Sequence, residues 1–161
     1  MLPGLTQQEA RDLIMSVGTH HRNRILSPLE VAELFRKAIT AGATPTECAE
    51  FVGLTGPTMI SKFLRLIKLT QEIRHIVDWG QTGATLSFTA AWHLADLNEF
   101  EQETVAREIL SSQMNWKEVH QVIQLKNCSP RRIEECVSEV LRMRRVIIRK
   151  HIFLGAVTDE R

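Results

Sequence analysis

Apolar residues recur every three or four positions along most of this chain, and that spacing gives one buried face on an α-helix. A clear example lies in residues 27–42, where the apolar face comprises Val31, Leu34, Phe35 and Ile39. The helix-start signal before it is strong, because Ser27 can cap the first turn, Pro28 suits the first helical position and Glu30 completes a capping box. No stretch alternates with the period of two that a half-buried strand requires, so we predict an all-α protein.

Further helices follow from the same criteria. Thr6 with Glu9 three residues later predicts a capped helix near the N-terminus, which Gly18 ends. Later helices are expected over residues 72–79, 86–97, 102–110, 116–125 and 130–151. The last of these carries a stripe of Ile, Val and Leu residues that would pack either on the domain or on a second copy of the chain.

Two short helices joined by a tight turn are predicted over residues 45–69. Thr44 or Thr46 caps the first helix, and Gly53 stops it. Pro57 suits the first turn of the second helix, because proline has a fixed φ and no N–H to lose. The faces expected to be buried comprise Cys48, Ala49 and Val52 in the first helix, and Ile60, Phe63, Leu64 and Ile67 in the second.

The opposite face of the second helix is polar and basic. It carries Thr58, Ser61, Lys62, Arg65 and Lys68. Hydroxyls and cations in a row, on a helix held off the core by a packed partner, are what insertion into the major groove of DNA requires. Close packing of any two helices would produce the same small residues around the turn, so from these residues alone both interpretations stay open.

Charge is segregated along the chain although the net charge is only +1. Residues 55–75 and 131–151 are both basic, whereas residues 96–103 carry Asp and Glu and no cation. These segments are candidate basic faces for phosphate and an acidic face turned elsewhere. The basic face of the last helix fits a solvated surface, a clamp on the DNA backbone, or a site for an acidic partner.

Composition excludes several classes of protein. The 161 residues, 43% hydrophobic and 24% charged, are those of an ordinary soluble globular protein of one domain, or of one domain with an appendage. Cys48, Cys128 and Cys136 show no CxxC spacing, and the adjacent His20 and His21 have no third ligand nearby, so we expect neither disulfides nor a bound metal. With no membrane span and no secretory signal, the protein is expected in the cytoplasm.

No spacing of acids and bases defines a reaction. The conceivable groups are Glu72, His75, Asp78 and His93, all of residue types that helix surfaces routinely carry. We therefore expect no enzymatic activity and no cofactor.

Taken in order, these elements resemble the central helix-turn-helix domain of the ParB family of partition proteins. The similar segments are LSPLEVAELF (26–35), TECAEFVG (46–53), ISKFLRLIKLTQEI (60–73), LSFTAAWHLADL (86–97) and MNWKEVHQVI (114–123). Several matching segments in unbroken order are more specific than one helix-turn-helix. The resemblance divides the chain into an N-terminal helix and connector (1–26), the DNA-binding domain (27–126), and a basic C-terminal helix and tail (127–161).

The resemblance implies site-specific binding of double-stranded DNA, as a homodimer on a palindrome. The process would be plasmid or chromosome partition, with a ParA-type ATPase as partner and the protein on the nucleoid or plasmid, or else transcriptional repression. The residues it places at the DNA are Thr46, Thr55, Gly56, Thr58, Met59, Ser61, Lys62, Arg65 and Lys68. Arg65 falls on the family's LRL arginine, which either contacts DNA or braces the domain.

Three departures from the family pattern leave the target site relaxed or different. The spacing from Gly53 to Ile60 is one residue longer, and Gly56 stands where the family often has a basic residue. The family's Gly-His-Ala-Arg segment, which supports DNA contact and nucleotide-linked clamping there, is Thr-Ala-Ala-Trp at residues 89–92. The alternative function is a helical protein-interaction module that has lost specific DNA contact.

The family's N-terminal domain binds and hydrolyses CTP, and the residues before the match are too few to hold it. No Gly-rich phosphate loop is present in the sequence either. CTPase activity is therefore expected to be absent, and the chain is either a fragment of a longer protein or a minimal relative.

Overall fold

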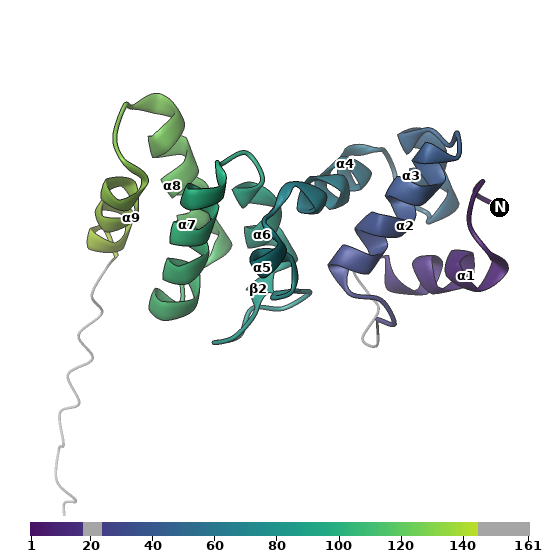
Figure 1. The fold of residues 1–161 in the computed structure, drawn as a ribbon, viewed down its shortest axis with the longest axis horizontal. Coiled ribbons are helices and arrows are strands. Elements are labelled where there is room, and N and C mark those ends of the chain that lie inside the picture. The colour runs from purple at the N-terminus through teal and green to yellow at the C-terminus, as the bar shows by residue number, and fades with distance from the viewer. Residues whose placement is uncertain (18–23, 145–161) are drawn as a thin grey trace, which may run out of the picture.

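The computed structural model describes residues 1–17 and 24–144, and its helices form an elongated array from α1 at one end to α9 at the other (Figure 1). The helices are α1 (Gln7–Ser16), α2 (Pro28–Thr40), α3 (Pro45–Phe51), α4 (Thr58–Arg65), α5 (Gln71–Arg74), α6 (Phe88–Leu94), α7 (Glu99–Ser112), α8 (Trp116–Cys128) and α9 (Ile133–Arg142). A 3₁₀ turn, η1 (Leu66–Lys68), continues α4, and two short strands are β1 (Val77–Asp78) and β2 (Leu86–Ser87). The prediction of an all-α protein is confirmed apart from this small strand pair.

At α1 and α2, side chains at the helix start satisfy the first backbone N–H groups, as the sequence predicts. At α2 the amide of Glu30 donates to Ser27 Oγ at 3.3 Å, and the amide of Ser27 donates to the Glu30 carboxylate at 2.7 Å. Thr6 and Glu9 form the same reciprocal pair at α1. Helix α1 ends at Ser16, and Gly18 lies outside the described residues.

Helix α2 packs against α1, α3 and α4 and is the centre of the N-terminal part. Its buried side chains are Pro28, Val31, Ala32, Phe35 and Ala38. Leu34 and Ile39, which the pattern predicts to lie inside, are only partly buried. The buried face is rotated toward the two alanines because their small side chains let neighbouring helices approach α2 closely.

Residues 72–79 are not the single helix that the pattern predicts. Helix α5 ends at Arg74, and the chain then extends into β1, where Val77 pairs with Leu86 of the parallel strand β2. The β-branched residues Ile76 and Val77 favour an extended backbone. The amide of Leu86 also donates to the carbonyl of Ile76 at 2.8 Å, and this bond fixes the loop before α6.

The C-terminal part consists of α7, α8 and α9, with α9 packed on both others. Helix α9 begins at Ile133 and not at Pro130, since Arg132 is its N-cap and has an extended backbone. The carbonyl of Arg131, just before it, accepts a bond from Lys126 Nζ at 3.1 Å. The rest of that predicted helix, beyond residue 144, lies outside the described residues, as do His20 and His21.

Four aromatic rings join α2, α4 and α6 in the core. The ring of Phe63, on α4, lies 5.7 Å from Phe35 on α2, 4.5 Å from Phe88 on α6 and 5.9 Å from Trp79, measured between centroids. Aromatic pairs at such distances stabilise beyond the area they bury. Phe63 therefore fixes the position of α4 relative to the elements on both sides.

Candidate nucleic-acid interface

Helices α3 and α4 form the predicted pair joined by a tight turn. Thr44, and not Thr46, caps α3, because its hydroxyl accepts from the amide of Glu47 at 3.2 Å. Gly53 ends the helix region with φ +75°, a left-handed conformation that glycine adopts at little cost. The amide of Leu54 then donates to the carbonyl of Ala49 at 2.8 Å, and the chain turns toward α4.

The buried side of α4 differs from the predicted stripe. Ile60 and Phe63 are buried as expected, but the following buried positions are Leu66 and Leu69, while Leu64 and Ile67 are partly buried. The spacing shortens to three because η1 tightens the end of the helix, and a 3₁₀ helix has about three residues per turn.

The N-terminus of α4 is open toward the outside of the molecule. Pro57 stands at its cap position without a capping hydrogen bond from its side chain, and its first turn contains no acidic residue. Ser61 Oγ donates to the carbonyl of Pro57 at 3.3 Å. The first N–H groups of a helix carry a partial positive charge that favours anions such as phosphate.

The residues that the sequence places at the DNA lie on α3, α4 and the turn between them, and on η1. Exposed among them are Thr46, Thr55, Thr58, Ser61 and Lys68, and partly buried are Gly56, Met59, Lys62 and Arg65. Within the described part of the chain, neither Lys62 nor Lys68 forms an ion pair with a carboxylate. Their charges are therefore available to an external anion.

Arg65 differs from the two lysines. Its guanidinium forms an ion pair with Asp96, beyond the end of α6, and lies 5.1 Å from the centroid of the Trp92 ring. Its Nε is buried without a hydrogen-bond partner among the described residues. These contacts favour the bracing role for Arg65 over contact with a base.

A stacked group beneath α4 was not foreseen from the sequence. The ring of Trp92, on α6, lies 3.7 Å from His93, and His93 lies 4.8 Å from His120 on α8. Burial, followed by the nearby charges of His120, Arg65 and Lys62, lowers the pKa of His93 to about 4. The sequence contained one sign of this group, which is that Trp92 stands where the family's Gly-His-Ala-Arg segment has its arginine.

Gly56 is not required by the backbone. Its φ lies outside the left-handed region, and a Cβ built on it would meet no heavy atom within 4 Å. The turn therefore has room for a side chain at the position where a basic residue was expected.

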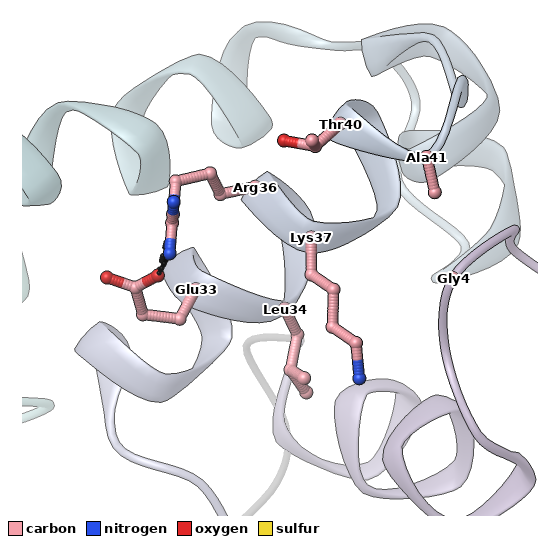
Figure 2. A pocket seen from close by; sticks show the side chains of 7 residues that line it. All are labelled: Gly4, Glu33, Leu34, Arg36, Lys37, Thr40 and Ala41. Atoms are coloured by element: carbon pink, nitrogen blue, oxygen red, sulfur yellow. Dashed lines mark hydrogen bonds and ion pairs between the residues drawn. The ribbon is translucent and has the colours of Figure 1, made fainter.

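An open hollow of about 530 Å³ lies beside α2, and Figure 2 shows the side chains that line it. Arg36 bonds Glu33 at 2.6 Å, and Lys37 bonds Glu9 of α1 at the same distance. None of the residues placed at the DNA lines this hollow.

Metal-ligand clusters and membrane-spanning helices are both absent from the described residues. In residues 1–17 and 24–144, no three His, Cys, Asp or Glu side chains lie together as metal ligands would. No helix in the same ranges is long and apolar enough to cross a membrane.

Comparison with known protein families gives one match. Residues 24–128 match the family model described as the ParB HTH domain, and this range contains α2 to α8. Comparison with curated proteins and with solved structures gives no significant match.

Proposed function

This chain belongs to the ParB helix-turn-helix domain family, and we propose that it binds a specific double-stranded DNA site through the exposed face of α4. A helix-turn-helix domain of this family indicates DNA as the partner. The observation that supports this face is that, in the described residues, neither Lys62 on α4 nor Lys68 on η1 pairs with a carboxylate, while the N-terminus of α4 has no side-chain cap.

Each part of the face has a proposed role. Thr58, Ser61 and Lys62 contact base edges in the major groove or the phosphates next to them. Thr55, Lys68 and the first N–H groups of α4 bind the backbone and set the orientation of the helix. Thr46, Gly56 and Met59 border this contact, and Arg65 holds α4 in place.

We place this binding in the partition of a plasmid or chromosome, or in repression, with the protein on the nucleoid or plasmid. Two copies on a palindrome would bind more tightly than one, because the second half-site is then bound at a high effective concentration. A ParA-type ATPase is the proposed partner in partition. We propose binding without catalysis.

The test begins with selection of duplexes from a random pool. Fluorescence anisotropy then compares the selected duplex with a scrambled one at two salt concentrations. We expect tighter binding to the selected duplex, with a slope of log affinity against log salt of about −3 to −4 for one copy and about twice that for a dimer. Equal affinity for both duplexes, abolished by moderate salt, would contradict the proposal and favour the protein-interaction module.

A further inference from the structure

Helix α6 meets the exposed side of α4 at Trp92. The ammonium of Lys62 lies 4.8 Å from the centroid of the Trp92 ring, and the Arg65 guanidinium lies 5.1 Å from it. A cation within about 6 Å of an aromatic centroid is attracted by the electrons of the ring. Two cations of the DNA-binding helix are therefore held by one side chain from another helix.

The Trp92 ring is itself fixed. It stacks on His93 with an interplanar angle of 28°, and His93 is 8% exposed. The His93 ring in turn packs against His120 on α8. A ring supported in this way gives its bound cation a defined position.

The two cations differ in whether a carboxylate neutralises their charge. The charge of Arg65 is neutralised by Asp96, whereas Lys62 has no carboxylate partner in the described ranges. In these ranges no carboxylate therefore neutralises Lys62, while the ring confines its long side chain. A lysine side chain that is free in solution loses considerable rotamer freedom when it binds, and prior confinement reduces that loss.

We propose that Trp92 is a positioning residue for DNA binding, which holds the Lys62 ammonium where it meets a DNA phosphate. The inference rests on the proposed function. It adds α6, outside the helix-turn-helix pair, to the parts of the chain that determine DNA affinity. It also gives a role to the aromatic residue that replaces arginine in segment 89–92.

The test is a double-mutant cycle on a selected duplex. Trp92→Leu keeps an apolar side chain and removes the ring, and we expect it to weaken DNA binding about two- to ten-fold. The same change should have a much smaller effect when Lys62 is already alanine, because only the contact of the ring with Arg65 is then lost. Lys68, which has no aromatic partner in the described residues, is the matched control. The fold-losses in DNA affinity caused by Trp92→Leu and by Lys68→Ala should multiply in the double variant, as expected for independent sites.

A measurement without DNA separates positioning from general damage to the fold. In the wild type, ring currents of Trp92 should shift the Lys62 ε-methylene protons upfield in the NMR spectrum, and Trp92→Leu should abolish that shift while the protein still unfolds cooperatively. An unshifted Lys62 in the wild type would overturn the inference. So would a cycle in which Trp92→Leu weakens binding equally with and without Lys62, or a gain in affinity from Trp92→Leu.

The two proposals fail in different ways. If the wild type does not distinguish selected from scrambled DNA, the proposed function is wrong. If the wild type does distinguish them but Trp92 and Lys62 are not coupled, only the positioning role is wrong.

Discussion

Three cations on one helical segment have different surroundings, and residue type alone does not reveal this. Arg65 is held by Asp96 and by an aromatic ring, Lys62 is held by the ring alone, and Lys68 is exposed without a partner in the described part of the chain. Because their partners differ, removing each cation should affect stability and DNA binding in different proportions.

The first prediction separates stability from binding. Arg65→Ala should lower the free energy of unfolding by about 1 kcal/mol, as expected for a partly exposed ion pair with additional packing. Lys62→Ala should leave stability nearly unchanged but weaken binding to the selected duplex. Urea denaturation and fluorescence anisotropy of both variants measure this, and an equal loss of stability in the two would contradict the assigned roles.

The second prediction concerns Gly56. Gly56→Arg should fold normally, because a side chain there meets open space, and should steepen the salt dependence of DNA binding by about one unit of slope through an added phosphate contact. Gly56→Ala is the control for the backbone effect and should leave the slope unchanged. An arginine variant that is folded but binds like the alanine variant would show that the turn does not face DNA.

The third prediction concerns pH and His93, whose pKa is lowered to about 4 from an ordinary value of 6.5. As the pH falls below 6.5, the unfolded chain takes up this proton while the folded protein still excludes it. Above pH 6.5, His93 is neutral in both states and its titration does not change the free energy of unfolding. As the pH falls from 6.5 to about 4, that free energy decreases by up to about 3 kcal/mol.

The control is His93→Phe, which retains a ring against Trp92 but does not titrate. The difference in unfolding free energy between wild type and variant, measured by urea denaturation from pH 7 to pH 4, isolates this residue from other titrating groups. A difference that does not change with pH would mean that His93 is already accessible to protons in the folded protein.

At the scale of elements, local signals in the sequence were sufficient to predict most helices. Capping residues and turn glycines act within a few positions of the helix end, so Ser27 with Glu30 and the turn at Gly53 were predicted correctly. The helix expected over residues 72–79 failed because pairing with β2, which lies outside the predicted helix at Leu86–Ser87, overrides the local pattern.

The fourth prediction concerns the anchoring of α4. Phe63→Ala should lower the free energy of unfolding by about 3–5 kcal/mol, because it leaves a cavity among three aromatic rings. Phe100→Ala, at a side chain that is 63% exposed, should change it by less than about 0.5 kcal/mol. Similar losses in the two variants, measured by urea denaturation, would mean that α4 is not anchored through Phe63.

At the scale of the whole molecule, the candidate site combines helices that are separated along the chain. The polar and basic row on α4 was predictable, since it follows from helical spacing and residue type within one segment. The ion pair between Arg65 and Asp96 and the position of Lys62 over Trp92 were not, because both depend on how α4 and α6 pack. Sequence periodicity shows which face of a helix is buried, but it does not show which neighbour covers it.

The most direct test of DNA binding through α4 is an NMR titration of the ¹⁵N-labelled chain with the selected duplex. We predict that the largest chemical-shift changes occur in the amides of residues 55–62, with a change in the Lys62 side chain as well. Changes confined to α8 and α9, with the amides of α4 unmoved, would contradict the assignment of the DNA-binding face.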